Sequence, residues 1–346
     1  MSYTILRINS FYNEFIKQYY KGNPNITNLN YNEQHNHIIT SSFENATFIS
    51  KRLQEIGIIV IDIITNATKL QQSWAKQFIK NKNYSNIEIL TQQVKYYKPD
   101  IIWIDDFSII TPQWINEIKQ LVPSIKKITG HHCAPYNNFL IEKFKNLDFI
   151  FTCTPCFKKL FSQQGLKTYM LYHSFDKSIY DIIASENIQK NYNLIFIGSL
   201  YTGGGYHDTR IKYIEQLIEN NIDIEIFGNI ESSQKIFLKN LLYILFSKIN
   251  KKNIITKLFP YIKKYEHYGK NKVSNYSQTL KQKINPPIFG KKMFELLYSS
   301  YSIFNLHVDA AYQCAGNIRM FEATGMGTCL ITDWKENLHQ LFDTEN

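Results

Sequence analysis

The sequence predicts an α/β protein built from two doubly wound domains, and three observations predict this class. The chain has 346 residues, more than the ~100–200 residues usual for one domain. Short apolar runs alternate with helix-like patterns through the first half, which is typical of a parallel sheet covered by helices. A second series opens at Leu194 with a strand, a glycine-rich loop and a helix. We expect an N-terminal domain over 1–180 and a C-terminal domain over 181–346.

The composition fits two such domains. Hydrophobic residues make up 44% of the chain and aromatic residues 15%, which is enough for two cores. The first residues run directly into a strand pattern without the features of a signal peptide, and no run of about 18 apolar residues could span a membrane. The five cysteines are odd in number and scattered, as expected for reduced thiols. We therefore expect a cytoplasmic protein.

In the first half, apolar runs predict strands and the segments between them show helical spacing. The expected strands cover 5–8, 58–64, 101–104, 125–129, 147–151 and 167–171. The expected helices cover 38–56 (ended by Gly57), 70–79, 87–97 and 114–122.

Two of these strands end in residues capable of proton transfer. The strand 101–104 is followed by Asp105 and Asp106, and the strand 125–129 leads to His131 and His132. Ligands bind at the carboxyl ends of parallel strands, and a carboxylate or imidazole can accept a hydroxyl proton near neutral pH. Asp106 and His131 are the catalytic candidates, and the alternative is that they cap turns or bind an acceptor passively. No further ligand lies at short spacing from the adjacent histidines, so we expect no metal there.

Cys153 and Cys156 have the C-x-x-C spacing of redox motifs, after a strand and before a helix. Thioredoxin-like sites lie early in a small domain, whereas this pair lies late in a long one, so we do not expect a redox site. We expect small residues that pack at a strand–helix turn. Farther on, His173 either faces a ligand or makes an ordinary hydrogen bond, and the polar stretch 185–191 is the expected linker.

The second domain opens with a phosphate-cradle layout. The strand 194–197 ends at Gly198 and Ser199, and a run of glycines precedes a helix at 211–218. The glycines fit neither the dinucleotide nor the Walker pattern. Arg210, at the start of the helix, either adds charge to a phosphate site or lies on the surface. The next expected strand covers 222–227.

A lysine-rich insertion near 235–283 departs from a minimal domain of this kind. From Lys235 to Lys292 there are fourteen lysines and one acidic residue, whereas the net charge of the whole chain is +10. An apolar helical stripe starts at Ile236. The segment is either an amphipathic element for a membrane surface or an anionic acceptor, or a core helix followed by a solvated basic loop. We expect no nucleic acid binding, because no recognition fold accompanies the basic residues.

The C-terminal stretch carries the most chemistry. A strand at 302–306 runs into His307 and Asp309, a helix begins at Asn317, and another strand covers 330–333. The free N–H groups of the helix, its dipole and Arg319 form an anion site, and Glu322 lies on the same face as Arg319. This set suits a ligand with phosphate and vicinal hydroxyls, such as a nucleotide sugar. The alternative is a core helix in which the two charges merely pair.

These residues carry a resemblance to a known family. The stretch resembles the donor-binding domain of glycosyltransferases with the GT-B fold, in particular the CgeB-like spore-maturation group. The resemblance rests on Asn305, His307, Asp309, Asn317, Arg319, Glu322, Ala323, Thr324, Gly325, Gly327, Thr332, Asp333, Asn337, Leu338, Leu341 and Phe342. It implies two Rossmann-type domains that face a central cleft, an acceptor domain first and a donor domain second. Glu322 would hold the ribose, while the loops at Gly198, Ser199, His307 and Asp309 would face phosphates or sugar.

The resemblance implies a hexosyltransferase-like enzyme that moves a sugar from a nucleotide diphosphate to a hydroxyl of a glycan, lipid or protein. No Asp-x-Asp motif is present, so we expect neither a metal nor a cofactor. Retaining relatives often carry a second glutamate where this chain has Cys314, so the stereochemistry is not predicted. Relatives generally continue farther, so the C-terminal domain is expected to be truncated. Two alternatives stay open. One is a non-catalytic basic module that binds acidic polymer or a membrane surface, as a peripheral contact on the inner membrane face. The other is a sugar-nucleotide epimerase of the same fold.

Overall fold

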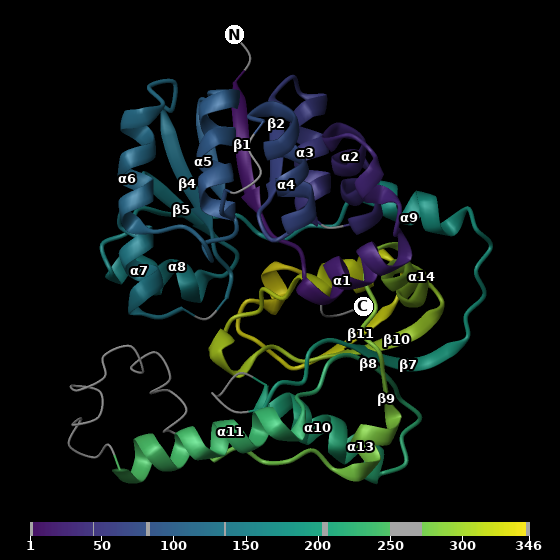
Figure 1. Ribbon diagram of the computed structural model, residues 1–346. Coiled ribbons are helices and arrows are strands. Elements are labelled where there is room, and N and C mark those ends of the chain that lie inside the picture. Colours follow the sequence, from purple (N-terminus) through teal and green to yellow (C-terminus); the bar gives the residue numbers. More distant parts are fainter. Residues whose placement is uncertain are drawn as a thin grey trace. The chain divides into compact units, whose positions relative to one another are not determined.

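The computed structural model describes residues 3–43, 45–80, 84–134, 136–202, 207–249 and 272–343. They form an α/β fold with two parallel, Rossmann-like sheets, which confirms the predicted class (Figure 1). Unit 1 comprises Met1–Glu186 and Phe289–Phe294, and unit 2 comprises Asn187–Ile288 and Glu295–Asn346. The acceptor and donor roles of the two domains stay predictions.

Unit 1 is built on a six-stranded parallel sheet with the order β2-β1-β3-β4-β5-β6. Its strands are β1 (Thr4–Asn9), β2 (Ile59–Ile64), β3 (Ile101–Ile104), β4 (Lys127–His131), β5 (Phe149–Thr152) and β6 (Thr168–Met170). Strand β1 has neighbours on both sides, with Ile5 paired to Val60 of β2 and to Ile101 of β3. All six strands of this sheet lie at positions that the apolar runs predict.

Helices connect these strands. They are α1 (Asn13–Gly22), α2 (Tyr31–Ser42), α3 (Asn45–Glu55), α4 (Thr68–Phe78), α5 (Asn86–Tyr97), α6 (Pro112–Leu121), α7 (Asn138–Phe144), α8 (Pro155–Gln163) and α9 (Lys177–Ala184), with the short 3₁₀ turn η1 (Ile26–Asn28). The prediction of one helix over 38–56 is wrong, because Phe43 adopts a left-handed φ of 50° and ends α2. Capping boxes at Asn30 with Glu33 and at Ser85 with Glu88 start α2 and α5.

Unit 1 also includes a short strip from much later in the chain. Phe289 packs against Tyr12, with ring centroids 5.6 Å apart. Gly290 has a φ of +61°, and a Cβ there would lie 2.7 Å from the carbonyl oxygen of Ser41. Helix α14 (Lys291–Tyr298) begins in this strip and ends in unit 2. The local sequence pattern gives no sign of this return.

Unit 2 has a five-stranded parallel sheet with the order β11-β10-β7-β8-β9. Its strands are β7 (Tyr192–Ile197), β8 (Glu225–Phe227), β9 (Ile284–Asn285), β10 (Ser300–Asn305) and β11 (Cys329–Thr332). Numbered within the unit, this order reads 5-4-1-2-3, as in doubly wound nucleotide-binding folds. A buried cluster that includes Phe196, Ile214 and Ile226 packs against one side of this sheet.

The other elements of unit 2 are α10 (Asp208–Glu219), α11 (Ser233–Ile244), the π-helical turn η2 (Leu245–Ile249), α13 (Gln278–Lys283), η4 (Asp309–Ala311), α15 (Ile318–Gly325) and η5 (Leu338–Gln340). Residues 250–271 of the lysine-rich insertion lie outside the described residues, as do the glycines at 203–205. After β11 the chain forms the 3₁₀ turn η5. Among the described helices, none has the length and apolar character needed to cross a membrane.

Candidate functional site

The sheet of unit 2 has a topological switch point between β7 and β10. The chain proceeds from β7 to β8 and β9 on one side of β7, and β10 and β11 lie on the other side. Gly198 and Ser199 follow β7, and Leu306 and His307 follow β10. In open α/β sheets, ligands bind outside the carboxyl ends of the strands at this point. The topology therefore brings two of the predicted donor-binding segments together.

Arg210 links the two strand ends. Its Nη1 donates to the carbonyl of Ser199 at 3.1 Å, and its Nη2 donates to the carbonyl of Leu306 at 2.5 Å. Arg210 is only 7% exposed, so the surface alternative is wrong. Burial lowers the pKa of Arg210 to about 10, although the nearby carboxylates of Asp309 and Asp333 act in the opposite direction. Its guanidinium thus fixes the geometry of the switch point.

The backbone is also packed closely here. A Cβ on Gly228, which follows β8, would lie 2.0 Å from the carbonyl oxygen of Gly198. The Gly198 amide donates to the carbonyl of Phe227 at 3.0 Å. Gly228 therefore has to lack a side chain for the end of β7 to keep this position.

His307 is held rigidly at the end of β10. The Nδ1 atom of His307 lies 2.7 Å from Oδ1 of Asp333, which also accepts the His307 backbone amide at 3.1 Å. Burial raises the pKa of Asp333, but the hydrogen bonds and charge of His307 outweigh this and hold it well below its usual range. The His307 side chain is 1% exposed, and its Nε2 has no hydrogen-bond partner among the described residues. This nitrogen is available to a ligand.

Helix α15 starts beside the same strand end. Asn317 caps it by accepting the backbone amide of Arg319 at 2.9 Å, and its Nδ2 donates to Oδ1 of Asn305 at 2.9 Å. Asn305 in turn donates to the hydroxyl of Thr332 at 3.0 Å. The predicted start of the helix is confirmed, and its cap is tied to the ends of both β10 and β11.

Arg319 and Glu322 form an ion pair on this helix. Nη1 of Arg319 lies 2.7 Å from Oε2 of Glu322, and both side chains are largely buried. The pairing that the alternative interpretation requires is therefore present. It does not remove the anion-binding potential of the helix N-terminus, because the carboxylate lies one turn farther along α15.

Two residues near this site were not among the sequence candidates. Nζ of Lys335 lies 3.2 Å from Oδ2 of Asp333 and donates to the carbonyl of Tyr312 at 3.0 Å. Asp333 belongs to the family-like pattern, so its position after a strand was the available signal. Lys335 has no such signal in the sequence.

Asp309 and His207 lie beside the first residues of α10. Oδ2 of Asp309 accepts the backbone amide of Thr209 at 3.2 Å, and Asp309 is exposed. Nδ1 of His207 accepts the Tyr201 amide at 3.2 Å. Burial, followed by the charge of Arg210, lowers the pKa of His207 to about 4, so the ring is neutral at physiological pH. His207 was missed because it directly follows a segment with no recognisable motif.

In unit 1, the carboxylate of Asp106 is engaged in a turn. Its Oδ2 accepts the hydroxyl of Thr65 at 2.7 Å, and both its oxygens accept hydrogen bonds from Ser108. These contacts are those of a turn cap, the alternative role noted from the sequence. The catalytic role of Asp106 stays a prediction.

His131 pairs with Asp105 and not with Asp106. Nδ1 of His131 lies 3.6 Å from Oδ1 of Asp105, and Oδ2 of Asp105 accepts Nη2 of Arg7 at 2.7 Å. Burial opposes ionisation of Asp105, but Arg7 and then His131 outweigh it and lower its pKa. The sequence shows both Asp105 and Asp106 after the strand. Which of the two carboxylates contacts His131 depends on the direction of their side chains, which the sequence does not show.

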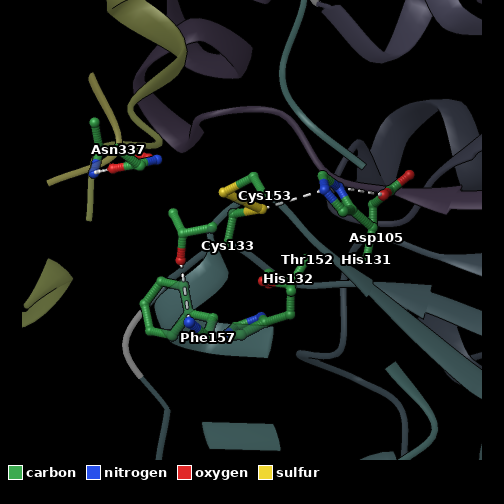
Figure 2. Close-up of a disulfide and its surroundings, with 10 residues drawn as sticks. Asp105, His131, His132, Cys133, Thr152, Cys153, Phe157 and Asn337 are labelled. Atoms are coloured by element: carbon green, nitrogen blue, oxygen red, sulfur yellow. Dashed lines mark hydrogen bonds and ion pairs between the residues drawn. A yellow bond between two sulfur atoms is a disulfide. The ribbon is translucent and has the colours of Figure 1, made fainter. Parts of the chain in front are cut away.

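The cysteines correct an expectation. Cys133 and Cys153 are joined by a disulfide, with their Cα atoms 5.5 Å apart (Figure 2). The expectation of five reduced thiols is therefore wrong, and Cys153 does not pair within its C-x-x-C spacing. The reason is topological: Cys133 follows β4, Cys153 follows β5, and these parallel strands are neighbours. Among the described cysteines, Cys329 is a free thiol.

Comparisons with known proteins bear on unit 2. Residues 213–346 match a family described as glycosyl transferase-like. No curated protein matches the chain in sequence. The donor-binding roles of Gly198, Ser199, Arg210, His307, Asp309, Asn317, Arg319 and Glu322 stay predictions, as does the absence of a metal.

Similar solved structures include two of an alpha-glucosyltransferase in complex with UDP and a 13-mer DNA, one with a central A:G mismatch and one with an HMU base. They are 13% and 12% identical, cover 96% of this chain and 79% of theirs, and have TM-scores of 0.47 and 0.45. An E. coli ADP-heptose lps heptosyltransferase II is 10% identical over 96% of this chain and 84% of its own, with a TM-score of 0.34. At these values the likeness carries no argument about function, and the fold assignment rests on the two sheets themselves.

Proposed function

We propose that the chain is a GT-B-type glycosyltransferase whose unit 2 binds a nucleotide-diphosphate sugar. The observation that carries the proposal is the position of α15, which starts at the end of β10 beside the switch point and holds Glu322 against Arg319. The glycosyl transferase-like match over 213–346 supports it, because it covers β10 and α15. Membership of the CgeB-like group rests on the sequence pattern alone.

The chemistry of the transfer fits these residues. The bond from the sugar carbon to the diphosphate breaks as the acceptor oxygen bonds to that carbon, and the acceptor proton passes to a base. Negative charge then develops on the leaving diphosphate. The free amides at the start of α15 and the guanidinium of Arg319 would stabilise that charge as it forms. Glu322 would accept hydrogen bonds from the two ribose hydroxyls.

His307 adds a fixed contact for the donor. Because Asp333 accepts the Nδ1–H of His307, the opposite nitrogen of the ring carries the lone pair when the ring is neutral. That Nε2 is buried and has no partner among the described residues. It would accept a hydroxyl of the sugar or, when protonated, donate to a phosphate oxygen.

We infer that donor binding does not need a divalent cation, since Arg319, the helix N-terminus and Lys335 supply positive charge on the protein itself. On the acceptor side, Asp106 and His131 are the candidates for holding the proton of a glycan, lipid or protein hydroxyl. An epimerase of the same fold would act on the nucleotide sugar without any acceptor, which separates the two activities in one assay.

Thermal unfolding with UDP, GDP, TDP and CMP tests the donor site. A ligand at one hundred times its dissociation constant adds about 2.7 kcal/mol, which raises the midpoint by a few degrees. We expect a shift with one nucleotide, undiminished by EDTA, that is lost in Glu322→Ala and kept in Glu219→Ala, a change on the exposed end of α10. The absence of a shift with all four nucleotides would contradict the donor site.

A second observation favours contact with a membrane surface. Helix α11 buries Ile236 but leaves four apolar side chains exposed, namely Phe237 (65%), Leu238 (56%), Leu241 (46%) and Ile244 (43%). The fourteen lysines between 235 and 292 provide positive charge in the same segment. Apolar side chains with adjacent cations suit an anionic lipid surface. We propose that this helix makes a peripheral contact with a membrane that contains anionic lipid.

Co-sedimentation with vesicles tests this contact. We expect binding to vesicles with anionic lipid, weaker binding in salt, and loss of binding in Leu238→Glu with Leu241→Glu. Binding to neutral and anionic vesicles alike, or binding that survives both substitutions, would contradict the role of α11. An anionic polymer that competes as well as the vesicles would instead support the basic-module alternative.

A further inference from the structure

Three neighbouring strands of unit 1 end in residues that can bind a metal. His131 is the last residue of β4, and Cys133 follows two positions later. Cys153 directly follows β5, and His173 lies three residues beyond β6. The sheet places β5 between β4 and β6. Their carboxyl ends therefore meet at one edge, and residues up to 42 positions apart in sequence come together there.

The ligand atoms at this edge form a compact group. Among the described residues, the sulfurs of Cys133 and Cys153 and a ring nitrogen of His173 lie within 4.8 Å of one another. Nε2 of His131 lies 3.2 Å from the sulfur of Cys133. The rings of His131 and His173 are nearly perpendicular, with their centroids 5.7 Å apart. Two sulfurs and one imidazole thus lie close together, and a second imidazole lies beside the sulfur of Cys133.

The surroundings of His131 resemble those of a metal-bound histidine. While its Nε2 faces the sulfurs, its Nδ1 faces Oδ1 of Asp105 (Figure 2). Asp105 is itself fixed by Nη2 of Arg7 at 2.7 Å and by the indole N–H of Trp103 at 3.0 Å. A metal-binding histidine usually donates its second N–H to a carboxylate in this way, which sets the tautomer and the ring orientation.

We propose that the reduced protein holds a zinc ion at this edge, bound by the thiolates of Cys133 and Cys153 and by His131 and His173. Two thiolates and two imidazoles form a closed tetrahedral set that Zn²⁺ prefers. The disulfide form offers no thiolate, so it binds no zinc. The site therefore has two exclusive states, one with a disulfide and one with a metal. This role for His131 is distinct from the catalytic one predicted for it.

The conversion balances chemically. A dithiol reduces the disulfide with two electrons and two protons, giving two thiols here, while the dithiol itself becomes a disulfide. Binding of Zn²⁺ then releases both thiol protons to water. The metal would tie the ends of β4, β5 and β6 together, as the disulfide does for β4 and β5. The inference goes beyond the proposed transfer reaction and does not depend on it.

Metal titration of the full chain tests the proposal. The protein is reduced with a phosphine, freed of metal, and titrated anaerobically with Co²⁺ and then Zn²⁺. We expect one ion per chain, a thiolate-to-cobalt charge-transfer absorption, ligand-field bands of tetrahedral intensity, displacement of Co²⁺ by Zn²⁺, and release of two protons. The oxidised protein should bind neither ion.

Variants locate the ligands. Cys133→Ser and Cys153→Ser should each weaken cobalt binding at least a hundredfold and should halve or abolish the charge-transfer band. His173→Asn should weaken cobalt binding at least tenfold. Cys329→Ser and His339→Asn, both at exposed positions of unit 2, should bind as the wild type does. Cys156→Ser tests whether the C-x-x-C pair is used instead.

The outcomes decide between the alternatives. Far-ultraviolet circular dichroism identifies variants that fail to fold. If a cysteine variant does not fold, the charge-transfer band of the cobalt-loaded wild type still shows whether sulfur binds the metal. Binding by the reduced wild type without that band would overturn the site. Binding that is lost in Cys156→Ser but kept in Cys133→Ser would overturn the assignment of ligands, and no binding at micromolar metal would overturn the proposal altogether.

Discussion

At the strand ends of unit 2, the polar side chains come mostly from one continuous stretch, residues 305–335, and acidic side chains form ion pairs with basic ones. At the strand ends of unit 1, they come from separate loops, and the group combines sulfurs, imidazoles and a buried ion pair. In unit 2 the Arg319–Glu322 and His307–Asp333 pairs leave a nitrogen and a helix N-terminus for a ligand. In unit 1 the residues satisfy one another. The same kind of sheet edge is thus cross-linked in unit 1 and is the predicted ligand site in unit 2.

The buried ion pair of unit 1 gives the largest expected effect. Arg7→Met leaves the largely buried carboxylate of Asp105 without its closest cation, and the loss of one partner of such a pair typically costs about 3–5 kcal/mol. Urea unfolding measures the loss. Lys17→Met, which breaks the exposed pair with Glu14, is the control and should cost less than about 1 kcal/mol. Equal effects for the two variants would show that the edge of unit 1 does not depend on this pair.

Arg210 has the corresponding role in unit 2, with a smaller expected cost. Arg210→Met removes charge-assisted hydrogen bonds to two carbonyls and should destabilise the protein by about 2–3 kcal/mol. It should also abolish the nucleotide-induced shift, because the two sides of the switch point lose their link. Lys212→Met, on the exposed side of the same helix, should change neither quantity. If nucleotide still raised the unfolding midpoint of Arg210→Met, Arg210 would stabilise the fold without being needed for nucleotide binding.

The third prediction concerns acid. The folded-state pKa of Asp333 is lower than its unfolded value of about 3.9, so its stabilisation is present above that pH and is lost as the pH falls toward the folded pKa. Asp333→Asn should therefore cost about 1–2 kcal/mol at pH 7 and less at pH 3, where the carboxyl of the unfolded chain is already mostly protonated. Urea unfolding at both pH values measures this, with the exposed Asp223→Asn as control. A cost independent of pH would mean that the charge of Asp333 does not matter.

The smallest effect compares two helix caps. Asn137 caps α7 in unit 1 and Asn317 caps α15 in unit 2, each by accepting a backbone amide. Substitution of either by Ala should cost about 1 kcal/mol. Only Asn317→Ala should also weaken nucleotide binding, since Asn317 positions the predicted anion site. If both variants bound nucleotide equally well, the N-terminus of α15 would not be part of the donor site.

The sequence predicted most of the fold and one of the two strand-end groups. Apolar runs located the strands, and the turn residues before Ile318 located α15, because both signals are local. The break at Phe43 was missed, since a left-handed residue other than glycine leaves no pattern. Arg210 was found but its burial was not, because its partners are backbone carbonyls.

The sulfur–imidazole group could not be read from local spacing. Cys133 and Cys153 are twenty residues apart, and His173 is another twenty residues away. They meet only because β4, β5 and β6 are consecutive in the sheet, and that order is not visible in short motifs. For a similar reason, the sequence did not show that Asp105, and not Asp106, is the partner of His131. Adjacent side chains on a chain leaving a strand point in different directions.

The late strip at Phe289–Phe294 has a consequence for how the protein is made. Unit 1 is interrupted by residues 187–288, which belong to unit 2. At a synthesis rate of about 5–20 residues per second, the ribosome needs roughly 5–20 s to pass from one part of unit 1 to the other. During that time Tyr12 lacks Phe289, and Phe43 lacks Phe294. The first unit to be translated is therefore completed only after residues 187–288 of unit 2 have been made, and during synthesis its unfinished face is open to chaperones.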